Sequence, residues 1–136
     1  MPAFANTPIA CIIVLAAALW VTSGQASVDF DCEVGVRVSG DLGDGVTLHT
    51  CRWERTPGVF VRAGPLRLIK NGVVILKLQT DRDGVLQGEY SAWDDDGELT
   101  ETGHYRDGLK EGEWRSVDEQ GVSRVTVYRA GVAQDL

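Results

Sequence analysis

The sequence predicts an all-β fold, an antiparallel meander of repeated β-hairpins that begins with a disulfide-linked hairpin. The first indication is the glycine content, 16 of 136 residues with only four prolines, which is typical of many turns at positive φ. The second is a series of short runs in which apolar and polar residues alternate, the pattern of half-buried strands. The third is an internal repeat. Three glycines and an aromatic residue, Gly84, Gly88, Tyr90 and Gly97, recur 24 positions later as Gly108, Gly112, Trp114 and Gly121.

Residues 1–26 are predicted to be a signal peptide. Residues 9–21 form an unbroken apolar run, and Gly24 and Ala26 put small residues at positions −3 and −1 of a cleavage site after Ala26. The run is too short for a hydrocarbon core of about 30 Å at 1.5 Å per residue. No Lys or Arg precedes the run, so an uncleaved anchor is the alternative. We expect the mature chain to be periplasmic or secreted, with no stable membrane span.

Residues 27–60 are predicted to form an N-terminal β-hairpin segment. Cleavage of the signal peptide would remove Cys11, one of the three cysteines. The remaining pair, Cys32 and Cys51, indicates a disulfide in an oxidising compartment. A turn at residues 40–43 would place the two cysteines opposite each other, whereas a turn at residues 44–45 would separate the sulfurs. We therefore expect the turn at residues 40–43. A redox-active or metal-binding thiol pair is the alternative, although the spacing is not that of a CxxC motif.

Residues 61–136 are predicted to form the repeat sheet, in one continuous domain with residues 27–60. The Asn-Gly pair at residues 71–72 is the strongest hairpin signal, because both residues accept positive φ. Each later unit has a strand with an aromatic residue, a turn that ends in glycine, and a second strand. Residues 64–72 fit a degenerate first copy, in which Leu66 takes the aromatic position.

The repeat aromatics are expected to stack into one buried strip, because a single ribbon cannot bury a face alone. Residues 59–61 are expected to extend this strip on its N-terminal side. The alternative is an exposed aromatic row that stacks on a glycan or a peptide. Trp93 lies outside the repeated position and is expected to be the most exposed of the aromatics. The repeat aromatics are Tyr90, Tyr105, Trp114 and Tyr128.

The charge pattern limits the classes of partner. A net charge of −7 argues against nucleic acid, which requires clustered Lys and Arg, and against anionic membrane surfaces. Residues 27–80 carry 7 basic and 6 acidic side chains, whereas residues 81–136 carry 6 basic and 14 acidic ones. The acidic excess therefore lies in the repeats, and the expected partner is another protein.

The acidic turn after Trp93 supplies the candidate surface-binding residues, which are Trp93 itself with Asp94, Asp95 and Asp96. A calcium loop needs alternating ligands and a distal bidentate Glu, and this turn does not complete that ring. We therefore expect a solvated turn, with calcium binding as the alternative.

No catalytic residue, metal site or cofactor is predicted. The carboxylates concentrate on turns, where water keeps such groups near their ordinary acidity. Ser116 and Ser123 lack the strained Gly-x-Ser-x-Gly setting of a nucleophile. His49 and His104 have no second ligand at metal-binding spacing and are expected to be polar strand or turn residues.

Residues 103–114 and the acidic turn at residues 118–121 resemble the MORN-repeat variant of YwqK-like proteins. The shared pattern is an aromatic, a polar pair, Gly, a spacer, Gly and an aromatic, followed by an acidic turn with Gly. The resemblance covers about residues 80–131. It implies a single-layer repeat sheet, a protein-interaction or membrane-associated module, or an antitoxin-like partner of a toxin.

These observations together predict a non-enzymatic, exported interaction module that presents its repeat sheet to a protein partner. A small-ligand binder, for a saccharide or for calcium, is one alternative. An antitoxin-like protein that neutralises a toxin is the other. Edge strands of an open meander give a route to a dimer, and the sequence does not determine the oligomeric state.

Overall fold

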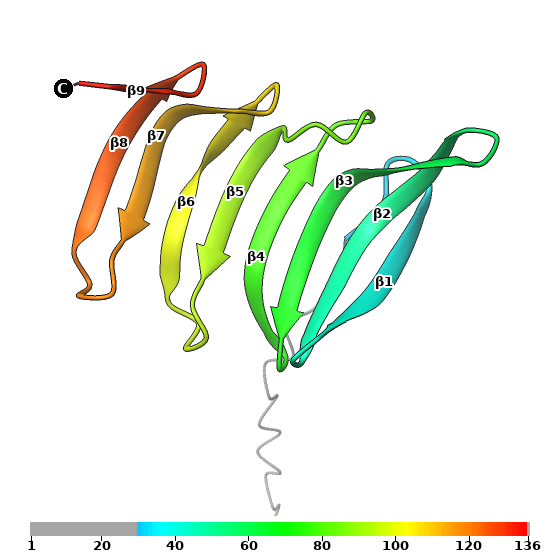
Figure 1. Cartoon of the computed structure of the whole chain (residues 1–136), viewed down its shortest axis with the longest axis horizontal. Helices are drawn as coiled ribbons and strands as arrows, with labels where there is room; N and C mark the ends of the chain where they lie inside the picture. Colours follow the sequence, from blue (N-terminus) through cyan, green and yellow to red (C-terminus); the bar gives the residue numbers. More distant parts are fainter. Residues whose placement is uncertain (1–29, 136) are drawn as a thin grey trace, which may run out of the picture.

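The structure is a computed structural model that describes residues 30–135, and these form one open antiparallel sheet (Figure 1). The strands follow each other in chain order across the sheet, so every strand pairs with its sequence neighbours. The predicted all-β meander is confirmed, whereas the predicted signal peptide lies outside the described residues. The strands are β1 (Val36–Gly43), β2 (Val46–Thr56), β3 (Val59–Lys70), β4 (Val73–Thr80), β5 (Gly88–Trp93), β6 (Leu99–Arg106), β7 (Leu109–Val117), β8 (Ser123–Arg129) and β9 (Val132–Gln134).

Four hairpins close with two-residue turns in which both residues have positive φ. This geometry matches the right-handed twist of the paired strands, and Asn, Asp and Gly adopt it at low cost. Three of these turns contain only Asn, Asp and Gly, as this geometry favours, whereas the fourth has an alanine at φ 48°. The pairs are Asp44 with Gly45, Asn71 with Gly72, Asp107 with Gly108, and Ala130 with Gly131.

Three further turns share one hydrogen-bond pattern that begins at an aspartate. In each, one carboxylate oxygen accepts the backbone N–H groups two and four residues later. The glycine three residues after the aspartate donates its N–H to the aspartate carbonyl. The acidic residue is therefore a structural part of the turn. These turns begin at Asp81, Asp94 and Asp118.

The register gives the sheet one apolar and one polar face. Leu68 pairs with Leu48 on one side and with Leu76 on the other, and Leu76 pairs in turn with Ala92. Because side chains alternate between the faces of a strand, these residues and the repeat aromatics share one side, named here the aromatic face. The opposite side, the polar face, carries a row formed by Arg67, Lys77, Ser91, Thr102 and Arg115.

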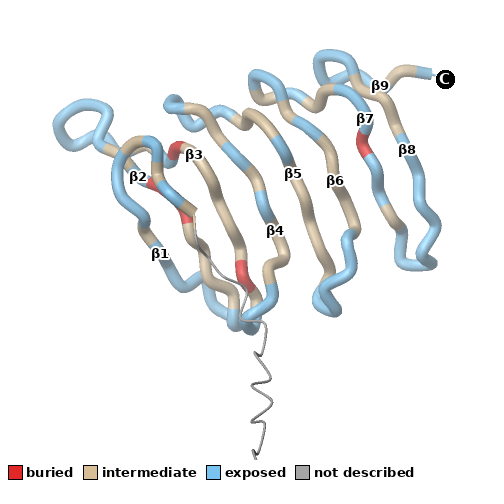
Figure 2. The backbone as a smooth tube through the Cα atoms, turned by 180° about the vertical axis from the view of Figure 1, so that it is seen from behind, coloured by how far each residue is buried: buried red, intermediate tan, exposed pale blue. Residues whose placement is uncertain are grey.

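The sheet has almost no enclosed core. Among residues 30–135 only four apolar residues are buried, and they lie scattered over β2, β3 and β7 (Figure 2). The remaining strand residues are half-buried or exposed, with the single exception of the buried Thr50, as expected for a single layer. The buried apolar residues are Cys51, Ala63, Ile69 and Trp114.

The predicted disulfide is present, but the predicted hairpin turn and register are wrong. Cys32 and Cys51 are bonded with Cα atoms 5.7 Å apart, although the turn lies at residues 44–45. In the hairpin, Cys51 pairs with Arg37. Cys32 lies before β1, in a segment that reverses at Gly35 (φ 79°) and folds back over β2. The disulfide therefore fixes this segment to the sheet and does not depend on the hairpin register.

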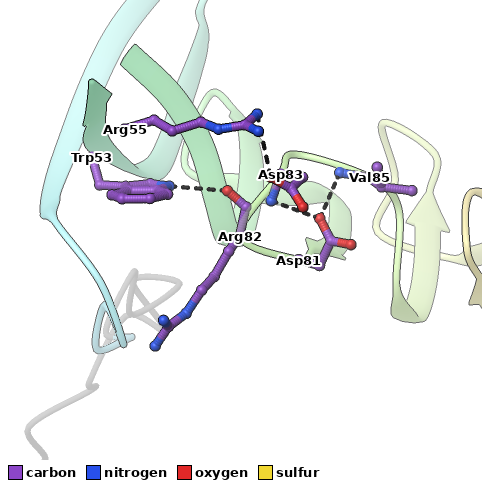
Figure 3. A network of polar contacts seen from close by, with 6 residues as sticks. All are labelled: Trp53, Arg55, Asp81, Arg82, Asp83 and Val85. Atoms are coloured by element: carbon purple, nitrogen blue, oxygen red, sulfur yellow. Dashed lines mark hydrogen bonds and ion pairs between the residues drawn. The ribbon is translucent and has the colours of Figure 1, made fainter. Parts of the chain in front are cut away.

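The long connection between β4 and β5 is held against β2 by side chains (Figure 3). Trp53 Nε1 donates a hydrogen bond of 3.0 Å to the carbonyl of Arg82. Arg55 forms an ion pair of 3.3 Å with Asp83. Asp81 accepts the N–H groups of Asp83 and Val85, which closes the turn. These contacts join the N-terminal hairpin to the β4–β5 connection, in addition to the strand pairing that links all nine strands of the described residues.

Candidate functional site

Four aromatic rings from four consecutive strands meet on the aromatic face. Tyr105 of β6 stands edge-on to Tyr90 of β5 and to Trp114 of β7, with ring centroids 5.7 and 5.0 Å apart. Tyr128 of β8 extends the row, 6.3 Å from Trp114 and also edge-on. Edge-to-face pairs at these distances are favourable beyond the area that they bury. The repeat therefore brings its aromatic positions together, as predicted.

Trp114 lies flat over Gly103 of the neighbouring strand. A Cβ atom at position 103 would stand only 2.2 Å from the indole ring, so glycine alone leaves room for it. The indole Nε1 donates a hydrogen bond of 3.1 Å to the carbonyl of His104. Trp114 is 3% exposed and forms the floor of the cluster.

An ammonium group is bound within the same cluster. Lys110 Nζ lies 3.9 Å from the ring centroid of Trp114 and 5.4 Å from that of Tyr128. It donates a hydrogen bond of 2.8 Å to Glu101 Oε1. The rings of Trp114 and Tyr128 and the carboxylate of Glu101 together bind the Lys110 ammonium. Such cation–π contacts and charged hydrogen bonds become stronger as water is excluded.

Two pKa values are displaced in this cluster. Burial alone lowers the pKa of the Lys110 ammonium, but the hydrogen bond and charge of Glu101, with Tyr105 and Tyr128, raise it overall. Burial also raises the pKa of the Tyr90 hydroxyl, as do Glu101 and Tyr105, while Lys110 opposes the rise. Both shifts favour the protonated form of each group.

The repeat aromatics fit neither the buried strip nor the exposed row completely. Trp114 is buried, as a structural strip requires, whereas Tyr90, Tyr105 and Tyr128 are half-buried. The expected extension by residues 59–61 is wrong for two of the three. Val59 is 50% and Phe60 53% exposed, and Phe60 packs against the guanidinium of Arg52, 4.6 Å from its ring.

Trp93 does not join the cluster. It lies 5.4 Å from Lys77 Nζ, which belongs to the polar face, and it is half-buried. Trp93 therefore lies apart from the repeat aromatics, but it is half-buried, as Tyr90, Tyr105 and Tyr128 are, so it does not stand out as the exposed aromatic that was expected.

The neighbouring aspartates do not converge on a shared point. Asp94 uses its Oδ1 within the turn, and Asp95 forms an ion pair of 2.6 Å with Lys70 of β3. Asp96 is exposed. Among residues 30–135, no group of three or more acidic, His or Cys side chains is placed to hold a metal ion.

The repeat glycines all have the positive φ that the repeat pattern requires. Four lie in turns, and the other two lie in strands, one as the first residue of β5 and one as the fourth residue of β7. The turn glycines are Gly84, Gly97, Gly108 and Gly121, and the strand glycines are Gly88 and Gly112.

Neither histidine is part of a recognisable site. His49 Nε2 lies 3.2 Å from Thr47 Oγ1 on β2. His104 is exposed on β6, and it lines a shallow hollow of about 320 Å³ on the polar face with Glu89, Glu113 and Arg115. This hollow contains both signs of charge and no hydrogen-bonded catalytic pair.

Sequence reasoning did not identify three members of the aromatic cluster: Gly103, Glu101 and Lys110. A glycine in the middle of a strand signals a close approach by a neighbouring side chain. The Asp-Gly turn at residues 107–108 fixes the register that pairs Tyr105 with Lys110. These two signals could have located the glycine and the lysine. Glu101 lies on the same face of β6 as Gly103 and Tyr105, but its contact depends on how the long Lys110 side chain extends over Trp114.

Comparison with known proteins gives no match to this chain among protein-family models, curated proteins or solved structures. The resemblance to MORN repeats therefore stays a prediction. Within residues 30–135, no helix is long and apolar enough to cross a membrane.

Proposed function

We propose that this chain is a non-enzymatic, exported interaction module that presents its aromatic face to a protein partner. The observation that supports the proposal is the row of half-buried tyrosines around a buried tryptophan, on a face that no described element covers. Tyr and Trp are the residues that most often dominate binding energy at protein interfaces.

Rigidity favours this role. The rings are fixed by one another and by Gly103, and the sheet below them is held by backbone pairing along its length. A surface that is already ordered loses little conformational entropy when a partner binds. The module would therefore bind through preformed geometry.

Two observations support export. The disulfide between Cys32 and Cys51 suits an oxidising compartment, since such bonds are rare in the reducing cytosol. The sequence of residues 1–26 has the pattern of a cleaved signal peptide. We place the mature protein in the periplasm or outside the cell.

Affinity capture with matched variants tests the proposal. The purified protein serves as bait for an envelope extract, beside a Tyr128→Ala variant of the aromatic face and a Trp93→Ala variant of the polar face. We expect one protein to bind stoichiometrically to the wild type and to Trp93→Ala, and to be lost from Tyr128→Ala. Absence of any bound protein at low and high salt, or equal binding by the two variants, would contradict the proposal.

Thermal denaturation separates this proposal from a small-ligand role. A ligand that binds only the native state must raise the melting temperature. We expect calcium and soluble oligosaccharides to leave it unchanged. A rise that is lost in Trp93→Ala would instead favour saccharide binding through the polar face.

A further inference from the structure

We propose that a small hollow on the polar face binds inorganic phosphate in a protonated form, hydrogenphosphate. The hollow has a volume of about 140 Å³ and lies over β3, β4 and β5, which are neighbours in the sheet (Figure 1). This site is on the opposite side of the sheet from the aromatic cluster, so the inference goes beyond the proposed function and does not depend on it. The residues that line the hollow are Arg67, Lys77, Leu78, Gln79, Glu89 and Ser91.

Two cations of the hollow stand directly opposite each other in the sheet. Arg67 of β3 pairs in register with Lys77 of β4, and both side chains belong to the polar face. Like charges in this position destabilise a strand pair, because their Cβ atoms are only about 5 Å apart. Arrangements that break such a local rule are expected at functional sites. An anion bound between the two cations would remove the repulsion.

The described residues leave this pair of cations without a carboxylate partner. Neither Arg67 nor Lys77 forms an ion pair within residues 30–135. Glu89 lines the same hollow from β5, where it pairs in register with His104, and it forms no ion pair with either cation. The charge of the pair is therefore available to an anion from solution.

The Arg67 guanidinium is already held in place for an anion. Its Nη1 donates a hydrogen bond of 3.1 Å to the carbonyl of Leu66, and its Cζ lies 5.6 Å from the centre of the Phe30 ring. The side chain is half-buried, and this burial lowers the pKa of the guanidinium, because lost hydration disfavours the charged form. Of the five N–H groups of a guanidinium, the bond to Leu66 uses one. The others can donate to phosphate oxygens, which guanidinium groups bind in a forked geometry.

Glu89 indicates which oxyanion the hollow accepts. A carboxylate repels a fully deprotonated anion such as sulfate. Hydrogenphosphate keeps one P–OH group, which can donate a hydrogen bond to Glu89 while the other oxygens accept from Arg67 and Lys77. The hydroxyl of Ser91 and the amide of Gln79 are neutral donors in the wall of the hollow. Several donors and one acceptor therefore match a protonated phosphate better than sulfate.

The polar face is the basic side of an acidic protein. By the alternation of side chains, its strand positions from β3 to β8 carry five basic and three acidic residues, although the whole chain has a net charge of −7. One of the acidic residues, Glu111, is already paired with Arg106. A local excess of positive charge attracts anions. The basic residues are Arg67, Lys77, Arg106, Arg115 and Arg129, and the acidic ones are Glu89, Glu111 and Glu113.

Calorimetric titration with three anions tests the inference. The purified protein is titrated at about pH 8 and constant ionic strength with sodium phosphate, sodium sulfate and glycerol phosphate, so that general screening is equal. A phosphomonoester loses its second proton near pH 6, so glycerol phosphate, like sulfate, has no proton to donate at this pH. We expect phosphate to bind with a dissociation constant of about 1 mM or lower. The other two anions should bind at least about tenfold more weakly.

Two variants of the hollow and one control locate the binding. Lys77→Met keeps an apolar stem beside Trp93 and should weaken phosphate binding at least about tenfold. In phosphate-free buffer the same variant should melt at or above the wild-type temperature, because the repulsion with Arg67 is lost. Arg115→Met removes a cation of the same face that has no cation opposite, and it should leave the affinity within about twofold. Glu89→Gln should tighten sulfate binding at least about tenfold.

Several outcomes would overturn the inference. Equal affinities of the wild type for phosphate and sulfate, or no binding up to about 20 mM phosphate, would each do so. Equal losses in Lys77→Met and Arg115→Met would show general attraction to the polar face. A lower melting temperature of Lys77→Met in phosphate-free buffer would assign Lys77 a structural role. Tyr128→Ala should bind phosphate as the wild type does, so loss of the protein partner and loss of phosphate binding are separate results.

Discussion

At the scale of single residues, the contact between Gly103 and Trp114 determines the aromatic face. The indole ring occupies the space that any side chain at position 103 would need. The φ of Gly103 is not in the left-handed region, so its role is to provide space. The ring can lie flat on the sheet and contact Tyr90 and Tyr105 only because position 103 carries no side chain.

Replacement of this glycine should destabilise the protein. Gly103→Ala forces either the indole or the strand to move, and overpacking of this kind costs about 1–3 kcal/mol. Urea denaturation measures the loss. Gly40→Ala is the matched control, because Gly40 is also in a strand, has no positive φ, and a Cβ atom there would meet nothing within 4 Å beyond its chain neighbours. Equal stabilities of the two variants would show that the ring does not depend on this space.

The aromatic cluster should also lose stability at high pH. Lys110 and Tyr90 both have a raised pKa in the folded state, relative to ordinary values of 10.5 and 10.0. A group with a raised folded pKa contributes stability that is complete below the unfolded pKa and is lost as pH rises through the folded pKa. We expect the urea midpoint to fall above about pH 10. Lys110→Met and Tyr90→Phe should each flatten this fall, and profiles that superimpose on the wild type would contradict the assignment.

The members of the cluster differ in how far the sequence could predict them. The four aromatics were predictable because their spacing repeats with the glycines. Glu101 was not, because its hydrogen bond depends on how the long Lys110 side chain extends over the Trp114 ring. Residue spacing does not record the conformation of such a side chain.

At the scale of elements, one hairpin turn has a residue that does not favour its backbone conformation. Asp44, Asn71 and Asp107 occupy the first turn position in three hairpins, and Ala130 occupies it in the fourth at φ 48°. Its N–H donates to Glu111 Oε2, as the N–H of Asp107 donates to Gln87 Oε1. An Asn or Asp side chain can form a local hydrogen bond that stabilises this left-handed conformation, whereas an alanine side chain cannot.

A single substitution should remove this strain. Ala130→Asn keeps the backbone donor and supplies a residue that adopts the left-handed region, so we expect a gain of about 0.5–1 kcal/mol. The melting temperature of the purified variant measures it. Ala130→Val, which is β-branched, should shift the melting temperature in the opposite direction. A loss of stability in Ala130→Asn would mean that the turn is held by contacts other than its own conformation.

The first hairpin shows why a cysteine pair is an unsafe guide to register. The turn at residues 40–43 was predicted because it placed the cysteines opposite each other, although the Asp-Gly pair that follows is the stronger two-residue turn. The structure has the Asp-Gly turn, and Cys32 reaches Cys51 from outside the hairpin. A chain that folds back before its first strand can form the same bond in either register.

At the scale of the whole molecule, the disulfide compensates for the small core. Cys51 is fully buried at the point where the segment before β1 meets the sheet. Only three other apolar residues of the described chain are buried. The disulfide, which restricts the unfolded chain, therefore supplies a large share of the free energy of unfolding.

Reduction should therefore destabilise the protein strongly. The bond closes a loop with a sequence separation of 19, and the loop-entropy model gives about 3 kcal/mol for such a loop. Cys32→Ser should reproduce the effect of a reducing agent and should become insensitive to it. Intact mass before and after reduction reports the bond and the site of signal cleavage together. A melting temperature that does not change on reduction would show that the segment adds no stability.

The strand order could be predicted from sequence, but the exposure of the two faces could not. Consecutive hairpins with tight turns favour a meander, so the repeat pattern predicts the topology. The same pattern fits a buried strip and an exposed row equally well, because alternation shows which residues share a face and not what covers it. Half-burial of the tyrosines follows from the single layer, which the resemblance to MORN repeats implied and the alternation of side chains alone did not.

The strand order also bears on how the molecule folds. Each strand pairs only with its neighbours in sequence, so the contact order is low for an all-β protein and folding should be fast for this class. In such a linear array, stability is close to a sum of nearest-neighbour terms, and the shortest ladder marks the place where the array separates first. Among the ladders inside the array, the shortest joins β4 to β5, where two residue pairs are in register beside an isolated bridge between Thr80 and Leu86. Amide exchange would then divide the protein into two cooperative blocks, one closed by the disulfide and the other by the aromatic cluster.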